Sequence, residues 1–248
     1  MVAGRDGRVR VRSGFNPPTI RGVFSQHDII GWIETESDAL AATVTTESLS
    51  CAVPGCPAWT LRDLTWHLGR VQRFWAGVVR ADGDVEPVFV AAEPGPQDAD
   101  DLGPWMRAST VELTRALQDT PWAHPAWTWW KQPRTVGAIA RHQVQEAAVH
   151  RWDAQSAVGD PEPLLEPIAA DGVEEFLAIA PQMRDVRSIT FKAIDLGRSH
   201  DLSDAPASAT VSGAASDLVL FLYRRRSLEN VTIEGDRHAV ERFLVPIA

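Results

Sequence analysis

The segment from Thr60 to Ala81 restricts the fold of this chain more than any other. Its apolar side chains recur at intervals of three and four residues, the spacing of one face of an α-helix. It begins with Thr60 followed by Asp63, the pattern of a capping box. The apolar face consists of Leu64, Leu68, Val71, Trp75 and Val78. His67 falls on the same face, so we expect its imidazole to point inward.

Similar signals predict further helices and a few strands. We expect helices from a Ser25 N-cap to about Thr46, over Leu102 to Leu117, and from Val136 to about Ala157 after a Thr135 cap. Four helices in the first two-thirds favour an up-and-down bundle. Shorter helices are expected at 167–179, 217–225 and 237–244, and strands at 187–194, 207–212 and 230–234. The last third therefore predicts a small α+β unit.

These patterns divide the chain into four parts. Residues 1–22 show no apolar periodicity, and we expect a flexible tail there. The helical domain is expected at 23–160, a connecting helix and linker at 161–186, and the C-terminal α+β domain at 187–248. The predicted fold class is α+β.

Composition and charge exclude several classes of function. The chain has 248 residues and a formal net charge of −9, which argues against nucleic acid and anionic membranes as partners, because both favour a positive surface. No stretch approaches the roughly 20 consecutive apolar residues of a membrane helix, and none resembles a secretory signal. Two cysteines are too few for a disulfide scaffold. We therefore expect a soluble, cytoplasmic protein.

Glu146 and His150 are the strongest candidates for chemistry. They lie four residues apart on a predicted helix, so both project from one face, about 6 Å apart along the axis. One metal ion can bind both, and His67 can supply a third ligand from another helix. Two histidines and one glutamate are a catalytic zinc set, because a coordination position stays open for water or substrate. A core histidine beside a surface Glu–His ion pair is the alternative.

Other residues near these candidates each allow two interpretations. His142 can support the ligands or lie one turn too far away. Asp153 can accept a hydrogen bond from the His150 imidazole or cap the end of the helix. Cys51 and Cys56 can form a redox pair or simply occupy a tight turn. The tryptophans of segment 127–130 can line a cleft or belong to the core.

Other common catalytic motifs do not occur in the sequence. It contains no Gly-rich phosphate loop, no Gly-x-Ser-x-Gly elbow and no His-Glu-x-x-His motif. Each of these motifs has a defined mechanical role in its enzyme class. Nucleotide-dependent enzymes and serine hydrolases are therefore not indicated.

Several stretches resemble the mycothiol-dependent maleylpyruvate isomerase family, which belongs to the DinB-like metalloenzymes. They are VPGCPAWTLRDLTWHLGRV from Val53 to Val71, EAAVHRWDAQ from Glu146 to Gln155, ADGVEEF from Ala170 to Phe176 and ATVSGAASDL from Ala209 to Leu218. The resemblance covers nearly everything after residue 22. It implies a DinB-like four-helix bundle followed by a sterol-carrier-like α+β domain.

The resemblance also implies a ligand set and a cosubstrate. The positions that match the family's metal ligands are His67, Glu146 and His150, and the metal is usually zinc. The thiol of mycothiol takes up the open position, and a small-molecule electrophile is the second substrate. A catalytic arginine of the C-terminal domain matches Arg225. A small residue normally precedes that arginine, whereas Arg224 does here, so Arg224 and Arg226 are also candidates.

The implied chemistry allows two outcomes and has two competitors. A divalent cation favours the thiolate form of a thiol, which can add to an electrophilic carbon. An S-transferase keeps the adduct; an isomerase rotates it about the new single bond and then eliminates the thiol. The first competitor is a metal-dependent hydrolase that activates water, with Asp153 or His142 as the base. The second is a non-catalytic protein that binds a thiol or a metal.

Overall fold

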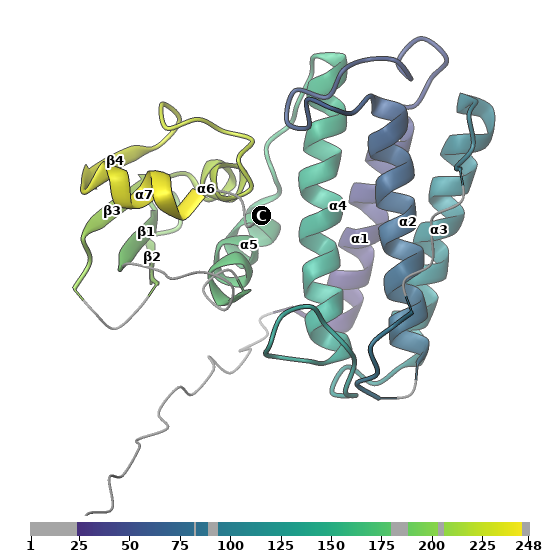
Figure 1. The fold of residues 1–248 in the computed structure, drawn as a ribbon, viewed down its shortest axis with the longest axis horizontal. Helices are drawn as coiled ribbons and strands as arrows, with labels where there is room; N and C mark the ends of the chain where they lie inside the picture. The colour runs from purple at the N-terminus through teal and green to yellow at the C-terminus, as the bar shows by residue number, and fades with distance from the viewer. Residues whose placement is uncertain (1–23, 82, 89–93, 180–187, 203–205, 245–248) are drawn as a thin grey trace, which may run out of the picture.

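The structure is a computed structural model of the chain. It describes residues 24–81, 83–88, 94–179, 188–202 and 206–244, so the tail expected at 1–22 lies outside the described residues. The elements are α1 (Gln26–Ala42), α2 (Leu61–Arg80), α3 (Ala99–Asp119), α4 (Val136–Val158), α5 (Glu166–Ile179), β1 (Ile189–Ala193), β2 (Arg198–Asp201), β3 (Ala209–Gly213), α6 (Ala215–Leu222), β4 (Thr232–Gly235) and α7 (Arg237–Leu244). A helical region precedes a small sheet domain (Figure 1). The predicted α+β class is confirmed.

The first two helices begin at capping boxes. The Thr60 hydroxyl accepts a hydrogen bond from the Asp63 amide, and the Asp63 carboxylate accepts one from the Thr60 amide at 3.0 Å. Ser25 and Asp28 form the same arrangement at α1. Each box satisfies amides that an open helix end would leave unpaired. Both predicted starts are confirmed.

Two predicted helix ends differ from the structure. The first helix ends at Ala42 rather than near Thr46, because the Ser48 hydroxyl accepts from the Thr45 amide and donates to the Thr43 carbonyl, which replaces helical bonds. α3 begins at Ala99, three residues before the expected start. Its first turn carries Asp100 and Asp101, and the positive end of the helix dipole favours acidic residues there.

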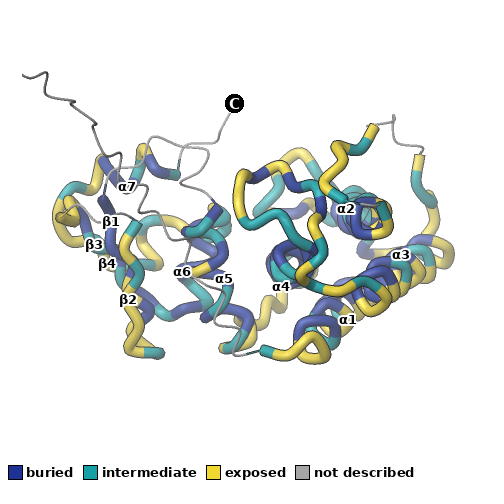
Figure 2. Tube along the Cα trace, turned by 90° about the horizontal axis from the view of Figure 1, so that it is seen from below, coloured by how far each residue is buried: buried dark blue, intermediate teal, exposed yellow. Residues whose placement is uncertain are grey.

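The expected up-and-down arrangement of the first four helices is wrong. α1 packs against α3 and α4, and α2 packs against the same two helices. Consecutive helices α1 and α2 therefore lie diagonally across the group (Figure 2). The connections over residues 43–60 and 120–135 are long enough to cross the end of the group, whereas an up-and-down bundle has short loops.

α4 lies between the other helices and the C-terminal part of the chain. It packs against α1 and α2 and also against α5 (Figure 1). Most of its residues are buried, including His142, His150, Arg151 and Asp153. Burying a charged side chain without a partner is costly, so the charged groups of this helix are expected to pair within the fold. This position makes α4 the element on which the candidate residues meet.

The C-terminal sheet has the strand order β2-β1-β3-β4. The central strands β1 and β3 are parallel, with Phe191 opposite Val211, and the edge strands pair antiparallel to them. The sequence did not predict β2, because its residues Arg198 to Asp201 are polar and mostly exposed. An edge strand with solvent on its faces needs no alternating apolar pattern.

One apolar core connects the two parts of the molecule. It includes Trp75 of α2, Val144 of α4, Ile168 of α5 and Phe221 of α6. α5 packs against both α6 and α4. The domain limits expected at 160 and 187 stay a prediction. None of the described helices is apolar and long enough to cross a membrane.

Candidate metal centre

Three side chains from two helices converge at one point. His67 comes from α2, and Glu146 and His150 come from successive turns of α4. One potential ligand atom from each residue lies within 4.8 Å of the other two. His150 is buried, whereas His67 and Glu146 are partly exposed. The structure therefore brings together the three residues that the sequence indicates as ligands; that they bind a metal stays a prediction.

The donor atoms fit a divalent cation. Zinc binds imidazole nitrogen and carboxylate oxygen at about 2.0–2.2 Å, so neighbouring ligand atoms of a tetrahedral site lie roughly 3.3–3.6 Å apart. Nε2 of His150 lies 3.4 Å from Oε2 of Glu146. The three potential ligand atoms lie within 4.8 Å of one another, so a small side-chain adjustment of His67 would bring them to tetrahedral spacing. A His2Glu set also leaves a fourth position open.

The three groups strongly perturb one another. Burial, together with the charge of His150, lowers the pKa of His67 to about 4. Burial alone would raise the pKa of Glu146, but the hydrogen bond and charge of His150 lower it to about 2. Burial alone would lower the pKa of His150, but hydrogen bonds to Asp153 and Glu146 raise it to about 9. Such mutual perturbation in a partly open site is typical of functional groups.

Asp153 holds His150 from behind. Its Oδ2 lies 3.0 Å from Nδ1 of His150, which leaves Nε2 directed toward Glu146. A carboxylate on the far nitrogen fixes the tautomer and ring orientation of a ligating histidine. The helix continues to Val158 and ends with Gly159 in the left-handed conformation. Of the two interpretations of Asp153, the structure supports the hydrogen bond to His150.

Arg225 connects the C-terminal domain to this carboxylate. Its Nε lies 3.0 Å from Oδ1 of Asp153, and one terminal nitrogen lies 2.7 Å from Oδ2. The Asp153 side chain is fully buried, so the guanidinium supplies the opposite charge that its carboxylate requires.

Of the three consecutive arginines, the geometry of the chain after α6 brings Arg225 to Asp153; its role in catalysis stays a prediction. α6 ends at Leu222, not at Arg225 as the sequence predicts, and Arg224 adopts a positive φ of 66°. This left-handed residue turns the chain, so that Arg225 faces α4 while Arg224 is exposed. Arg226 instead pairs with Asp217 and lies over the Trp152 ring.

The loop before α2 completes the surroundings of Arg225. The Cys56 sulfur lies 3.2 Å from a guanidinium nitrogen. A side chain on Gly55 would clash with Oδ1 of Asp153, so the close approach of this loop to Asp153 requires glycine there. Both Cys51 and Cys56 are free thiols, and the Cys56 amide donates to the Val53 carbonyl in a turn. The structure supports the tight-turn interpretation.

Aromatic rings lie beside the candidate ligands and around His142. The Trp59 ring lies 4.6 Å from the His67 ring and 6.4 Å from the His150 ring. Trp129 and Trp130 lie 5.6 Å and 5.2 Å from His142. Trp129 is partly solvent-exposed and Trp130 is buried, so the cluster contributes both to the surface beside the site and to the core.

The sequence did not indicate several residues that surround the site. Two of them, Gly55 and Trp59, lie in the loop before α2. The other two, Glu175 on α5 and Tyr223 after α6, are far along the chain from the candidate ligands. Burial, together with the charges of Glu175 and Glu146, raises the pKa of Tyr223 well above its usual range. Only the glycine within Pro54-Gly55-Cys56 is a local signal, for a turn rather than for a site.

The fold and the site together define a class of protein. It is an α+β protein whose helices carry a His2Glu cluster and whose C-terminal domain contacts that cluster through Arg225 and Asp153. The family model described as the mycothiol maleylpyruvate isomerase N-terminal domain matches residues 32–155, and the C-terminal domain model of the same family matches residues 167–242. The chain belongs to the mycothiol maleylpyruvate isomerase family.

Solved structures agree with this fold. A crystal structure of the mycothiol-dependent maleylpyruvate isomerase matches with a TM-score of 0.66, and one of its histidine-to-alanine mutants with 0.68. Each match covers 86% of this chain and 95% of the other, at 13% sequence identity. At that identity the match shows the fold. A search of curated protein sequences finds no match.

Proposed function

We propose that the chain is a metal-dependent enzyme that uses mycothiol as a cosubstrate, acting as an S-transferase or as a maleylpyruvate-type cis–trans isomerase. The convergence of His67, Glu146 and His150 in a member of this family carries the proposal. The solved structures of the same fold are those of a mycothiol-dependent maleylpyruvate isomerase. The cytoplasmic location expected from the sequence stays a prediction.

We assign the cation, with zinc as the first choice, to these three residues. When bound there, a divalent cation would favour the thiolate form of a thiol at neutral pH. The residues of the chain orient the site. Asp153 fixes the ring of His150, and Arg225 neutralises Asp153 from the C-terminal domain. Arg225 thus acts through Asp153 as a positioning residue.

Both reactions begin with the same bond. The thiol sulfur bonds to an electrophilic carbon, and the electron pair of the attacked bond moves onto the substrate. In a transferase this adduct takes up a proton or loses a leaving group and is released. In an isomerase, rotation about the former double bond precedes elimination, which returns the free thiol. The net isomerisation neither consumes thiol nor changes oxidation state.

The hydrolase alternative has weaker support. Its two candidate bases are Asp153 and His142. Asp153 is buried between His150 and Arg225, and His142 is buried with both ring nitrogens near carboxylates. A general base must reach the proton that it removes. Neither residue is available for that role in this arrangement.

A turnover assay on the full chain tests the proposal. Purified protein is supplied with Zn²⁺ and with maleylpyruvate or an activated aryl halide, with and without mycothiol. We expect product only when the thiol is present, and loss of product after treatment with a chelator. His150→Ala should abolish turnover. His238→Ala, which changes an exposed histidine on α7, should leave turnover unchanged.

The remaining outcomes separate the alternatives. Product formed without thiol but lost with the chelator would support the metal-dependent hydrolase. Tight binding of Zn²⁺ or mycothiol with no product from either electrophile would support the non-catalytic alternative. Turnover that His150→Ala leaves intact would remove the cluster from the mechanism.

A further inference from the structure

A second buried ion pair lies behind the candidate metal centre. His142 stands one turn before Glu146 on α4, and its Nε2 lies 3.5 Å from Oε1 of Glu146. Nδ1 of the same ring lies 2.8 Å from Oε1 of Glu175 on α5. His150 approaches the other oxygen of Glu146, Oε2. Each oxygen of Glu146 therefore faces a different imidazole.

The surroundings of His142 leave its ring little freedom. The side chains of His142 and Glu175 are 8% and 4% exposed. The rings of Trp130, Trp129 and Trp75 lie 5.2 Å, 5.6 Å and 6.4 Å from the imidazole. Close packing on several sides fixes a ring in one orientation. The line from Glu175 through His142 to Glu146 is thus a fixed feature of the fold.

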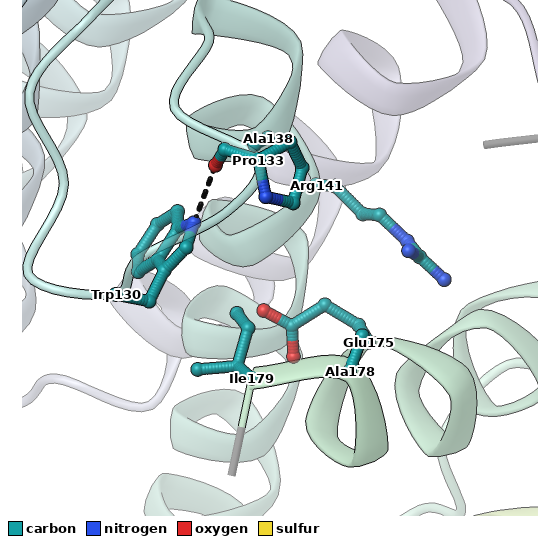
Figure 3. A pocket seen from close by; sticks show the side chains of 7 residues that line it. All are labelled: Trp130, Pro133, Ala138, Arg141, Glu175, Ala178 and Ile179. Carbon is teal, nitrogen blue, oxygen red and sulfur yellow. Dashed lines mark hydrogen bonds between the residues drawn. The ribbon is translucent and has the colours of Figure 1, made fainter. Parts of the chain in front are cut away.

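Glu175 does not simply tie α5 to α4. A separate ion pair already joins these two helices, because Nε of Arg141 lies 2.7 Å from a carboxylate oxygen of Asp171. Figure 3 shows the Arg141 side chain extending away from the Glu175 carboxylate, beside the cavity that both residues line with Trp130. Arg141 also pairs with Glu174 of α5 at 3.7 Å. Of the described ion pairs between these two helices, only that of His142 with Glu175 reaches a candidate ligand.

The arrangement repeats the support of His150. There, a residue of the C-terminal part, Arg225, contacts Asp153, which contacts the ligand. Here, Glu175 contacts His142, which contacts the ligand Glu146. Residues that hold a metal ligand from behind set its orientation and raise metal affinity.

We propose that His142 and Glu175 are positioning residues that orient the Glu146 carboxylate for the cation, so that α5 is a structural part of the metal site. This inference rests on the proposed function, because it requires that Glu146 bind a metal. It assigns Glu146 one line of support, in which His142 contacts the carboxylate and Glu175 of α5 holds His142.

Glu175→Gln is the variant that tests this role. It keeps the size of the side chain and removes its charge. The dissociation constant for Zn²⁺ is measured on the full chain by competition with a chromophoric chelator, and the Co²⁺-loaded protein gives a visible spectrum that reports ligand geometry. We expect a roughly 10- to 100-fold weaker Zn²⁺ affinity and an altered Co²⁺ spectrum.

Asp171→Asn is the matched control, because it removes the closer of the two ion pairs that Arg141 makes with α5. It should lower the thermal midpoint while leaving Zn²⁺ affinity within about twofold. His142→Ala should weaken Zn²⁺ binding as Glu175→Gln does, and the double variant should show less than the sum of the two effects, since both residues act along one line.

Three outcomes would overturn the inference. Wild-type Zn²⁺ affinity in Glu175→Gln, while the wild-type protein binds about one Zn²⁺, would remove α5 from the site and leave the proposed function intact. Equal weakening in Glu175→Gln and Asp171→Asn would reduce the role to packing of α5. Failure of the wild-type protein to bind Zn²⁺ or Co²⁺ at all would overturn the proposed function and this inference with it.

Discussion

Adjacent residues of α4 belong to two buried charge clusters that differ in completeness. Arg151 pairs with Glu36 of α1 at 2.7 Å, and each side chain is 4% exposed. The remaining nitrogens of its guanidinium donate to the Gln155 side chain and to the carbonyls of Glu162 and Pro163. Every charge in this cluster has its partner within the fold.

The cluster of His150 is built in the opposite way. Its imidazole nitrogens and carboxylate oxygens converge from α2 and α4, and 21% of the Glu146 side chain stays exposed. Supporting residues lie behind the candidate ligands, whereas among the residues that the structure describes no fourth side chain joins these three as a ligand. A buried charge that its neighbours satisfy ties helices together, whereas converging donors with an open side have the arrangement that a cation would require.

Removing a ligand should affect the metal cluster most. Glu146→Gln replaces the anionic donor of the three with a neutral amide, and His67→Ala removes a donor. Zn²⁺ affinity should therefore fall more than about 100-fold in each, beyond the effect of a supporting residue. Competition with a chromophoric chelator measures the affinity, and circular dichroism checks that the apoprotein stays helical. Unchanged affinity in both variants would contradict the assignment.

Breaking the self-contained cluster should change stability instead. Glu36→Ala leaves Arg151 without its counter-charge, and the free energy of unfolding should fall by about 3 kcal/mol. Urea unfolding measures this, with the exposed Glu34→Ala on the same helix as the control, where the change should stay within about 0.5 kcal/mol. A loss of Zn²⁺ affinity without destabilisation would show that the two clusters are not separate.

Changing Arg225 should produce an intermediate effect. Arg225→Lys keeps the charge but loses the planar two-pronged contact with Asp153, so kcat should fall about 10-fold while one metal per chain is retained. Steady-state turnover and metal content are measured on the same preparation. The exposed Arg224→Lys is the control, and full activity of Arg225→Lys would remove the residue from the mechanism.

The cap of α2 should have the smallest effect. Thr60→Ala removes the capping box of the helix that carries His67, and should cost about 1 kcal/mol of unfolding free energy without changing metal content. Thr60→Ser keeps the hydroxyl and should restore most of the stability. Loss of metal at unchanged stability would mean that the loop before α2 controls the position of His67.

Local patterns predicted most of the fold. The capping boxes and the apolar face around His67 depend on residues three and four apart, which interact within one helix. The spatial arrangement of the helices was not predictable in this way, because the long loop after α1 places α2 diagonally opposite α1 rather than beside it. β2 was not predicted because its residues are polar and mostly exposed, so they form no alternating apolar pattern.

The candidate site was likewise predictable only where its residues are local in sequence. Glu146 and His150 are close in sequence, so their shared face was predictable, and His67 followed from its place on an apolar stripe. Glu175 and Arg225 reach α4 from elements that only the tertiary fold brings near. Arg225 came from the family resemblance, and Glu175 had no local signal.

Metal content is the decisive test of the proposed metal centre. Wild-type protein and His150→Ala are purified without a metal-affinity tag and analysed by elemental mass spectrometry. We expect about one divalent ion per chain in the wild type and none in the variant. A wild-type protein that holds no metal even after divalent ions are supplied, or a variant that retains the metal, would refute the proposed metal centre.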